Sequence, residues 1–521
     1  MERTHLRADR VEADLDRVLA SAGDDVVVAS NRQPYRHDYD DGEVTVDRPA
    51  GGLTAGLDAV MRRVDGTWIA WGDGEADRAV VDGDDRVTVP PAADEGRYTL
   101  QRVWLDEDAV DGYYYGIANQ VLWPLCHGAL GTVESCGDDW DDYRRVNETF
   151  AASVADAADG DDFVWLHDYH LALVPREVRE RGERADDPRD DDPRDATIAH
   201  TWHIPWPGWD VFRACPRREA ILDGLLGNDL LVFHVPRYCE HFLRSADRGL
   251  DDAEVDYGAG TVDYRGRTTT VRAAPMGVPA DRIRREAASA EATGFRAAFR
   301  KNRGIDRDAR LAVGVDRLDY SKGIVQRLDA FERLFADRPE YRGEVTYVQV
   351  GTESRSSIDA YRRYQERVEA AVERVNDRFA TDEWRPVVYT TDMISNEGLA
   401  GLYREADLGV VSPVRDGMNL VAQEFVAAQD DDPAPLVLSD QAGAHDVLGE
   451  WVVSVRPHDT EGFADALETA LSMSERERRR RGSALADWVD DNDIGTWVRT
   501  VLGAVADLEP VDGGVQTRAD H

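Results

Sequence analysis

Two acidic side chains flank a glycine turn in the second half of the chain, where an apolar run meets a predicted helix. Residues 408–411 are short and apolar, as expected for a buried parallel strand, and Gly417 lets the backbone turn before a helix expected near Asn419. Asp416 stands at the turn, and Glu424 lies inside the helix. Free N–H groups and the positive end of the helix dipole would seat an anion or a sugar here. A plain strand-to-helix corner with solvated acids remains an alternative, because such corners recur in α/β folds.

Lysine is almost absent from the chain, yet one of its two lysines stands close behind an arginine at a predicted helix entrance. Arg317 and Lys322 follow a predicted strand, whereas Lys301 lies in a charged segment. Two cations at a helix N-terminus suit a diphosphate, because charge-assisted hydrogen bonds add to the helix dipole. Arg32 and Arg355 also follow strands, one in each half of the chain, and could jointly hold a phosphomonoester. Surface salt bridges with the many acids are the alternative for all of these cations.

Two further segments could contribute to a ligand site. Gly51 and Gly52 open a predicted helix, and glycine lets backbone N–H groups approach a phosphate, although a simple helix start explains the pair equally well. Tyr114 and Trp123 stand in a segment that we expect to be a loop. Their rings suit either the apolar face of a sugar or core packing.

Histidines follow two of the predicted strands in the first half. His167 and Asp168 come directly after residues 162–166, and His203 follows residues 197–202 at the start of a loop stiffened by two prolines. Zinc is conceivable, but no third and fourth ligands stand at the usual spacing. Because parallel α/β sheets place ligands at the C-terminal ends of their strands, we expect these side chains to face a ligand.

These residues need a scaffold of alternating strands and helices, and the sequence predicts two such scaffolds in tandem. Short apolar runs alternate with helical segments from residue 26 to residue 233, and the pattern restarts after residue 278. This alternation predicts two doubly wound parallel sheets. Since the loops named above follow strand ends, we expect them to converge in a cleft between the two units.

The composition indicates a globular protein with an unusual surface. The chain has 521 residues, 42% hydrophobic residues, 13 Trp and 18 Tyr, which suits large cores rather than a disordered chain. Its formal net charge is −41, and nearly all the positive charge is arginine. An acidic, lysine-poor globular protein is typical of adaptation to high salt, where screening removes self-repulsion. We therefore expect a halophilic microbial source. The charge disfavours nucleic acid as a partner.

Cysteine usage and hydropathy predict a reduced, cytoplasmic protein that does not bind a membrane. The cysteines at positions 126, 136, 215 and 239 show no CxxC or His-linked metal spacing, so we expect reduced structural thiols. We find no N-terminal apolar run like a signal peptide and no apolar stretch long enough for a transmembrane helix.

Eight short blocks carry a specific resemblance, in order and spacing, over about residues 25 to 500. They are Ser30-Asn31-Arg32, Gly51-Gly52-Leu53, Val121-Leu122-Trp123-Pro124, Tyr143-Arg144-Arg145-Val146-Asn147, Trp165-Leu166-His167-Asp168-Tyr169-His170, His203-Ile204-Pro205-Trp206-Pro207, Arg317-Leu318-Asp319-Tyr320-Ser321-Lys322-Gly323 and Arg415-Asp416-Gly417-Met418-Asn419-Leu420-Val421. Together these blocks resemble the trehalose-6-phosphate synthase family, a family of retaining glycosyltransferases.

The resemblance implies a GT-B fold of the α/β class, in which two Rossmann-like domains face each other across a cleft. We expect an N-terminal extension over residues 1–24 and an acceptor-binding domain over residues 25–270. A nucleotide-sugar-binding domain would follow over residues 271–485. Residues 486–508 would form a helix that packs back on the first domain, and residues 509–521 a disordered tail.

The resemblance also implies which residues bind the donor, a nucleoside-diphosphate glucose, for which we expect UDP-glucose. Arg317 and Lys322 would hold the diphosphate and stabilise the leaving group, and Gly51 and Gly52 would approach it from the other domain. His203 would bond a donor hydroxyl. The glucose hydroxyls would be bound by Asp416, Gly417, Met418 and Asn419. The nucleoside would be lined by Leu420, Val421, Glu424 and, at the base, Ile394. We expect His203, Arg317, Lys322 and Asp416 to be catalytic.

The acceptor implied by the resemblance is glucose 6-phosphate, and the product is α,α-trehalose 6-phosphate with release of the nucleoside diphosphate. The acceptor would be bound by Arg32, Tyr114, Trp123, Asp168 and Arg355. Trp123 and Ile204 would shape the pocket that selects the acceptor anomer. We expect a separate enzyme to remove the phosphate from the product, and the chain could form a homo-oligomer.

The implied reaction retains the configuration of the donor glucose. No carboxylate is placed as a covalent nucleophile, so we expect front-side displacement in which the leaving phosphate helps to deprotonate the acceptor, rather than glycosidase chemistry. Arginine and lysine take the place of a metal as phosphate counterions, and neither a metal nor a cofactor is expected. Closure of the domains would exclude water from the donor.

Three departures from the usual family pattern put the donor base in question. Trp206 stands where Phe is usual, Gln423 where Lys is common, and Ile394 where bacterial members often carry an aromatic residue. The choice between uracil, guanine and adenine therefore stays open.

Three other functions are alternatives to the synthase. A sister transferase could use glycerol 3-phosphate or glycerate and make a glucosylated compatible solute, which suits a salt-adapted host. A non-catalytic sugar-phosphate sensor is disfavoured because every expected ligand position is filled. A pyridoxal-dependent phosphorylase would need a Schiff-base lysine, and neither Lys301 nor Lys322 suits that role.

Overall fold

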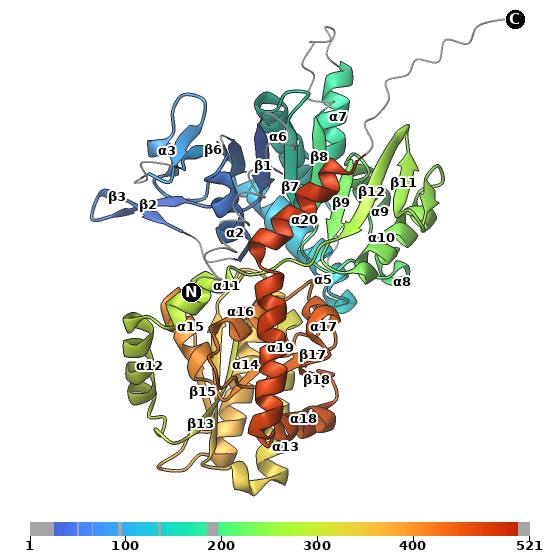
Figure 1. Cartoon of the computed structure of the whole chain (residues 1–521). Helices are drawn as coiled ribbons and strands as arrows, with labels where there is room; N and C mark the ends of the chain where they lie inside the picture. Colours follow the sequence, from blue (N-terminus) through green and yellow to red (C-terminus); the bar gives the residue numbers. More distant parts are fainter. Residues whose placement is uncertain are drawn as a thin grey trace, which may run out of the picture.

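The computed structural model describes residues 25–48, 52–64, 66–91, 96–133, 137–184 and 196–508, which form two α/β units, one above the other in Figure 1. The expected N-terminal extension, the expected tail and Gly51 lie outside the described residues. Each unit contains a largely parallel sheet with helices packed against it. This arrangement is the expected GT-B architecture.

The first unit is built on a sheet whose described strands lie in the order β10-β11-β12-β9-β8-β7-β1-β4-β6-β5. The strands from β12 to β6 pair in parallel, and antiparallel strands extend both edges. Their bounds are β1 Val26–Ser30, β4 Thr67–Trp71, β5 Arg86–Val89, β6 Tyr98–Val103, β7 Phe163–His167, β8 Thr197–Thr201, β9 Leu230–Phe233, β10 Glu254–Asp256, β11 Thr261–Tyr264 and β12 Arg267–Ala273. The central strands β1, β7 and β9 are buried along their whole length, as expected when helices cover both faces of a parallel sheet.

Helices cover this sheet, and one of them corrects the sequence prediction. The helices are α2 Gly52–Met61, α3 Asp77–Val80, α4 Glu107–Ala109, α5 Trp123–Cys126, α6 Asp139–Ala157, α7 Val174–Arg184, α8 Trp209–Phe212, α9 Arg218–Leu225 and α10 Pro236–Gly249. The expected loop around Tyr114 is wrong, because Val110–Leu122 forms a π-helical segment between α4 and α5. Several of its residues are buried, including Tyr113, so packing against the core favours a helical conformation here. A hairpin of β2 Arg36–Asp40 and β3 Glu43–Asp47 projects beside the sheet.

The second unit contains a sheet in which the described strands are all parallel, in the order β15-β14-β13-β16-β17-β18. Its strands are β13 Arg310–Arg317, β14 Val345–Thr352, β15 Val387–Thr390, β16 Leu408–Val411, β17 Leu436–Ser439 and β18 Val453–Val455. Its helices are α11 Ala280–Ala287, α12 Ala290–Arg303, α13 Ile324–Asp337, α14 Asp359–Phe379, α15 Asn396–Glu405, α16 Leu420–Ala428, α17 Gly443–Leu448, α18 Thr460–Leu471 and α19 Glu475–Asp491. Strand order reverses beside β13, which is where open α/β sheets place their ligands.

The chain passes between the two units at two adjacent points. Gly277 lies against Asn492 and Asp493, so closely that an added Cβ would come within 2.0 Å of the Asn492 carbonyl oxygen. The N–H of Ile494 donates to the Val278 carbonyl at 3.2 Å and ties the two crossings together. Because the glycine has no side chain, the two connections can lie in direct contact.

Helix α20, Ile494–Ala506, packs back onto the first unit, as expected, and lies across it in Figure 1. Trp497, Val498 and Val501 join a core cluster with Val28 and Trp165 of the first sheet. The crossing itself begins later than residue 486, because α19 extends to Asp491 and packs within the second unit. The first sheet likewise extends to Ala273, three residues beyond the expected domain boundary at residue 270. The domain limits at single-residue precision stay a prediction.

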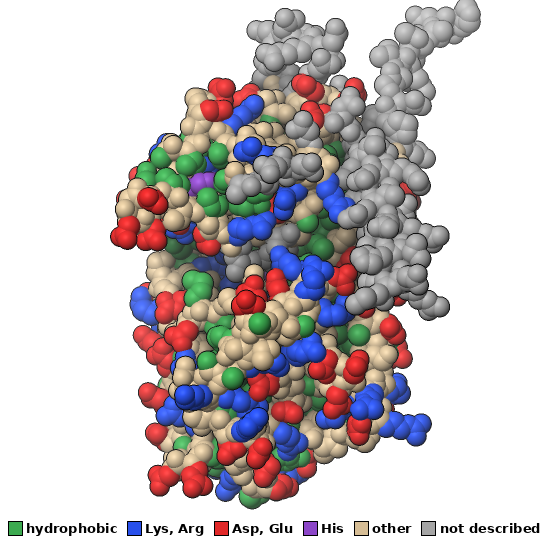
Figure 2. Space-filling model, turned by 60° about the vertical axis from the view of Figure 1, so that its left-hand side comes forward, with side chains coloured by type: hydrophobic (Ala, Val, Ile, Leu, Met, Phe, Trp, Pro, Cys, Tyr) green, Lys and Arg blue, Asp and Glu red, His purple; other side chains and the backbone are tan. Residues whose placement is uncertain are grey.

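Acidic and arginine side chains are interspersed over the face shown in Figure 2. Within the described ranges, no helix is both long enough and apolar enough to cross a membrane. The described cysteines, Cys126, Cys215 and Cys239, are free thiols. Cys136 lies outside the described residues.

Candidate functional site

Loops at the C-terminal strand ends of the two sheets meet, and we call this meeting region the junction. Arg355, which follows β14, donates from Nη2 to the hydroxyl of Tyr169, which follows β7, at 3.2 Å. Gly417, which follows β16, lies against the backbone of His203, which follows β8. The junction therefore brings together the loops after β7, β8, β14 and β16, which the sequence had singled out.

Both oxygens of the Asp416 carboxylate accept hydrogen bonds from groups of the second unit. Lys322 Nζ lies 2.5 Å from Asp416 Oδ2, the Gly417 N–H donates to Oδ1 at 2.9 Å, and Asn419 Nδ2 donates to Oδ2 at 3.0 Å. Burial opposes ionisation of this carboxyl, but Lys322, His127 and Arg317 together outweigh burial, and the pKa of Asp416 is lowered. The acid and the lysine therefore form an ion pair at neutral pH.

Gly417 is required here because a side chain would collide with the His203 backbone, and not because the backbone needs an unusual conformation. A Cβ at this position would stand 2.1 Å from the His203 carbonyl oxygen, and one at Gly443 would stand 1.9 Å from the Gly417 oxygen. The left-handed conformation falls instead on Asn419, with φ of 73°. The predicted tight turn at Gly417 thus has a different physical basis, because the turn is pressed between the two units.

The diphosphate candidates Arg317 and Lys322 stand at the end of β13 and in the turn before α13, as expected. The side chain of Asp319 accepts from the Ser321 N–H at 2.9 Å and shapes that turn. Gly323 completes it with φ of +68°, and its Cβ would meet the Ser412 carbonyl at 2.1 Å. The lysine is therefore presented by a turn that packs directly on the loop after β16.

A fully buried arginine supports both of these loops from behind. Arg327 donates to Ser412 Oγ at 2.9 Å, to Asp316 Oδ2 at 2.8 Å and to the Tyr347 hydroxyl at 3.0 Å. The charge of Asp316 helps to raise the pKa of Arg327 despite its burial. Because every contact lies inside the protein, Arg327 positions the loops and is not available to a ligand.

Arg355 belongs to the second unit but inserts among aromatic rings of the first. Its φ is 53°, an unusual conformation for a residue with a side chain. The guanidinium lies 4.4 Å from the centre of the Trp123 ring and donates to the Tyr361 hydroxyl at 2.6 Å. Arg317 also lies over the Trp123 ring, at 5.2 Å. Trp123 is thus a buried platform beneath two arginines.

The expected acceptor residues cluster around Tyr114 and Asp168. The Tyr114 ring stacks on His170 with centroids 5.8 Å apart. Burial opposes ionisation of this phenol, but Arg355, Arg32 and Arg317 together outweigh it and lower the pKa of Tyr114 to about 8. Burial raises the pKa of Asp168 to about 6, although the Tyr169 and His203 N–H groups donate to its carboxylate. Asp168 also has a positive φ, of 72°.

Both imidazole nitrogens of His203 contact other imidazoles. Nε2 lies 3.1 Å from His167 Nδ1, and Nδ1 lies 3.3 Å from His234 Nε2. The group that faces the Asp416–Gly417 turn is the His203 carbonyl. A side-chain contact to a donor hydroxyl would therefore require exchange of one of these ring contacts. The next residue, Ile204, is buried.

The expected nucleoside residues lie along α16 and the loop before α15. Leu420 packs against the cores of both units, whereas Val421 and Ile394 pack against the second alone. Burial raises the pKa of the Glu424 carboxyl. This carboxylate accepts a long hydrogen bond from the Tyr403 hydroxyl at 3.5 Å. Met418 is buried beside them. Gly52 begins α2 in the first unit.

Sequence reasoning missed several residues of the junction. They are His127, His234, Tyr238, Asp319 and Tyr361. Asp319 is fully buried beside Arg355, and the nearby cations lower its pKa although burial opposes this. His127 stacks on the Trp123 face with centroids 4.1 Å apart, and burial lowers its pKa to about 4. Only Asp319 lay inside a motif that the sequence had already singled out.

Several buried polar atoms at the junction have no hydrogen-bond partner in the described part of the chain. They are His127 Nε2, Asp319 Oδ2, Ser321 Oγ, Arg355 Nε and Asn419 Oδ1. Native proteins leave few such groups unpaired, so a cluster of them points to a polar ligand. No group of three or more His, Cys, Asp or Glu side chains in the described ranges is arranged to hold a metal ion.

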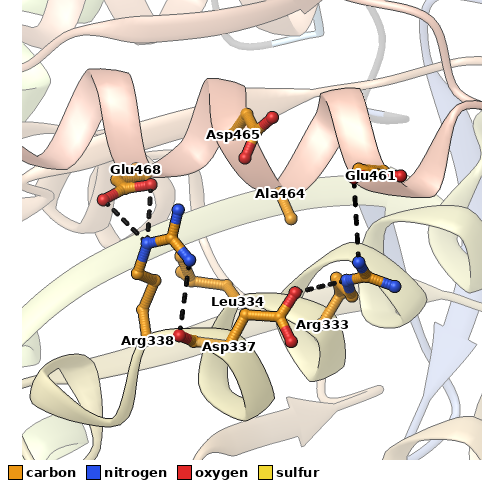
Figure 3. Close-up of a pocket in the computed structure, with 8 residues that line it drawn as sticks. All are labelled: Arg333, Leu334, Asp337, Arg338, Glu461, Ala464, Asp465 and Glu468. Carbon is orange, nitrogen blue, oxygen red and sulfur yellow. Dashed lines mark hydrogen bonds and ion pairs between the residues drawn. The ribbon is translucent and has the colours of Figure 1, made fainter.

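A separate pocket on the second unit is a poorer candidate. Its volume is about 100 Å³, and it lies between α13 and α18 (Figure 3). Arg338 pairs with Glu468 at 3.0 Å, and Arg333 pairs with Asp337 at 2.5 Å. These exposed charges already neutralise one another, which is typical of a solvated ion-pair network.

Comparison with known proteins agrees with this geometry. The sequence profile of glycosyltransferase family 20 matches residues 24–507. A trehalose-6-phosphate synthase of Sinorhizobium fredii is 35% identical over 480 residues, which cover 92% of this chain and 97% of the relative.

Two solved structures are similar at about the same level. One, described as trehalose-6-phosphate from E. coli bound with UDP-2-fluoro glucose, has a TM-score of 0.80 and 30% identity and covers 93% of this chain and 100% of that one. The other is a UDP-forming α,α-trehalose-phosphate synthase from Burkholderia xenovorans in complex with glucose 6-phosphate. It has a TM-score of 0.79 and 30% identity and covers 92% of this chain and 99% of that one. This chain therefore belongs to glycosyltransferase family 20.

Proposed function

We infer that this chain is a retaining glucosyltransferase, a trehalose-6-phosphate synthase. It transfers glucose from a nucleoside-diphosphate glucose to glucose 6-phosphate and forms α,α-trehalose 6-phosphate. The observation that carries this inference is the junction itself, where Arg317 and Arg355 of one unit lie over the Trp123 ring of the other and Gly417 lies against His203. In this proposal the donor site lies on the second unit's side of the junction, and the acceptor site lies on the first unit's side.

On the donor side, Arg317 and Lys322 bind the diphosphate and stabilise its charge as the glucosyl bond breaks. Asp416 and the turn through Asn419 bind the glucose hydroxyls, and Glu424 accepts from the ribose. Because Lys322 already pairs with Asp416 at 2.5 Å, binding a diphosphate places a second anion against the same lysine. The lysine thus couples recognition of the sugar to stabilisation of the leaving group.

On the acceptor side, Arg32 and Arg355 bind the phosphate of glucose 6-phosphate. The Arg355 guanidinium lies 6.0 Å from the centre of the Tyr114 ring, and Arg355 and Arg32 both lower the pKa of Tyr114, which supports an anion site beside this ring. Asp168 orients the acceptor hydroxyls, and Trp123 and Ile204 shape the anomer pocket. Trp123 packs under Arg317 and Arg355 alike, so both anion sites border the same ring.

Retention follows by front-side displacement in this proposal. The carboxylates nearest the reaction, Asp416 and Asp168, are each held by neighbouring donors rather than free to attack the sugar. Glycosidases instead use two carboxyl groups that flank the bond. The leaving phosphate takes the proton of the acceptor hydroxyl, and contact between the units excludes water. The reaction needs no metal or further cofactor, because cationic side chains serve as the phosphate counterions.

The proposal also covers the enzyme that acts on the product, the location of the protein and its oligomeric state. A separate phosphatase removes the phosphate from the product, and a trehalose or related solute would suit a protein adapted to high salt. Cytoplasmic location and a homo-oligomeric state are further parts of the proposal. A charge of −41 supports the halophilic source, because salt screens the self-repulsion of such a surface.

A donor–acceptor matrix in molar KCl tests this function. UDP-, GDP- and ADP-glucose are each incubated with glucose 6-phosphate or glycerol 3-phosphate, and products are identified by NMR. We expect a non-reducing disaccharide phosphate from glucose 6-phosphate, with the α configuration at both anomeric carbons. Product from glycerol 3-phosphate alone would assign the sister activity instead. Failure of glucose 6-phosphate to react with any donor would contradict the proposal.

A further inference from the structure

We propose that His167 and His234 are positioning residues for the donor site: with His203 they form a row of imidazoles that holds the His203 backbone against the Asp416–Gly417 turn. The proposal rests on the proposed function only in calling the turn a donor site. The row itself is a feature of the fold, and neither His167 nor His234 has a role in the assignments above.

The row follows the order of the sheet. β7, β8 and β9 are parallel neighbours, and each is followed or ended by one of the three histidines. His167 Nδ1 lies 3.1 Å from His203 Nε2, and His203 Nδ1 lies 3.3 Å from His234 Nε2. His234 Nδ1 lies 3.5 Å from the carbonyl oxygen of Ala274, just after β12, the next strand. The contacts thus cross four adjacent strand ends.

The carbonyl at one end gives the row a direction. A carbonyl oxygen only accepts, so Nδ1 of His234 carries the proton and its Nε2 accepts from His203 Nδ1. His203 Nε2 then accepts from His167 Nδ1. One lone pair is left over, on His167 Nε2, and this buried atom has no partner in the described residues. The opposite direction would point a lone pair of His234 at the Ala274 oxygen, which is repulsive.

This arrangement fixes each ring as a neutral Nδ1–H tautomer. Trp497 of α20 covers the row, with its ring centred 6.4 Å from that of His167 and 6.2 Å from that of His203. Burial lowers the pKa of all three imidazoles, and that of His234 falls to about 4. A shielded row of neutral rings is a rigid support, since each ring holds the next through a directed hydrogen bond.

The row reaches the donor turn through two contacts. The His203 carbonyl touches Gly417 so closely that a Cβ there would stand at 2.1 Å. Four residues after His234, the Tyr238 hydroxyl donates to the Asp416 carbonyl at 2.9 Å. A shift of His203 or of the segment after His234 would therefore move the turn. Asp416 would move with it relative to Lys322.

Substitutions that remove or preserve the hydrogen bonds test the proposal. His234→Leu and His167→Leu remove them, whereas His234→Gln keeps an acceptor at the Nε2 position and His167→Asn keeps a donor at the Nδ1 position. His458→Leu, an exposed histidine far along the chain, is the matched control. Initial rates are measured in molar KCl with UDP-glucose and glucose 6-phosphate varied independently.

We expect both leucine variants to raise the KM for UDP-glucose about tenfold, because each leaves a buried nitrogen of His203 unpaired. The KM for glucose 6-phosphate should stay within about twofold, and the amide variants should recover most of the donor affinity. Equal rises in both KM values would overturn the proposal, as would leucine variants that match the wild type or amide variants that fail as badly as leucine.

Two readouts separate this proposal from the function on which it rests. If the wild type transfers no glucose, calorimetric binding of UDP-glucose replaces the KM values, with the same expected order of variants. If the leucine variants do not fold, long-range ¹⁵N–¹H correlation of histidine-labelled wild type decides the matter. We expect the Nδ1–H tautomer at positions 167, 203 and 234, and an Nε2–H tautomer at His203 or His234 would overturn the row.

Discussion

The two faces of the junction use different chemistry. The first unit presents rings: Tyr114 stacks on His170, Trp123 stacks on His127, and His167 stacks on His203. The second presents charges, with Lys322 and Asp416 in contact at 2.5 Å. Rings define the shape of a pocket and exclude water, whereas paired charges stabilise charge that develops during reaction. The difference indicates that one face selects and orients the acceptor while the other activates the donor.

Arg355 departs from this division and explains how the faces cooperate. It belongs to the second unit, yet its guanidinium lies over Trp123 and donates to the Tyr169 hydroxyl of the first. An acceptor phosphate bound by this arginine would therefore be held by both units at once. Acceptor binding and contact between the units are coupled for this reason.

The largest loss of activity should come from removing Lys322 from the charged face. We expect Lys322→Ala to lower kcat by about 100- to 1,000-fold, because the leaving diphosphate loses its main cation. Binding of glucose 6-phosphate, measured by calorimetry, should hardly change. Lys301→Ala is the matched control, since it removes the other lysine, which is exposed. Turnover of Lys322→Ala at the wild-type rate would refute the assigned role.

Truncating Arg355 should act mainly on the acceptor. We expect Arg355→Ala to raise the KM for glucose 6-phosphate about 10- to 100-fold, because charge-assisted hydrogen bonds to the phosphate are lost. The affinity for UDP, measured separately, should remain close to that of the wild type. Arg363→Ala on the exposed side of α14 serves as control. A larger loss of UDP affinity than of acceptor affinity would place Arg355 on the donor side.

The pH dependence of kcat/KM should show the ionisation of Tyr114 on the ring face. Its pKa of about 8 means that the phenol ionises as the pH rises through 8 in the empty protein. A phenolate repels the acceptor phosphate, so kcat/KM for glucose 6-phosphate should fall above pH 8, by at most about tenfold per pH unit. Tyr114→Phe should abolish this alkaline limb, whereas Tyr115→Phe should keep it. An unchanged limb in Tyr114→Phe would show that another group titrates.

The smallest effect should come from the rim of the junction. Arg237 of the first unit pairs with Asp446 of the second at 3.0 Å, and both side chains are partly exposed. We expect Arg237→Ala to change the KM values by less than about fivefold in dilute salt, because such pairs contribute little. In molar KCl the effect should disappear, since the screening length falls to about 3 Å. Arg237 also donates to the Tyr238 hydroxyl at 3.3 Å, so an effect that persists in molar salt would mean that Arg237 acts through this hydrogen bond rather than through its ion pair.

Sequence patterns predicted the strand ends well, because each site loop follows a short apolar run. Lys322 and Asp416 were placed at strand-end turns, and the structure brings their side chains together. The role of Gly417 was harder to foresee, since its contact with His203 depends on how two separate units meet. The helical conformation around Tyr114 was missed because three adjacent tyrosines and two glycines resemble a loop.

The imidazole row could have been predicted from the sequence, but the prediction was not made. His167, His203 and His234 each follow one of three successive predicted strands, and successive parallel strands are usually neighbours. That rule would have placed the rings side by side. The contact of Tyr238 with Asp416 could not have been inferred, because it joins residues far apart in sequence across the junction.

A crystal structure with UDP and glucose 6-phosphate bound, grown at high salt, tests the central claim most directly. We predict the diphosphate of UDP against Arg317 and Lys322, and the sugar phosphate between Arg32 and Arg355. The two ligands should lie on opposite sides of the junction, with the glucose 6-phosphate ring beside Trp123. Both phosphates on one face, or a sugar phosphate bound away from Arg355, would contradict the division of labour between the faces.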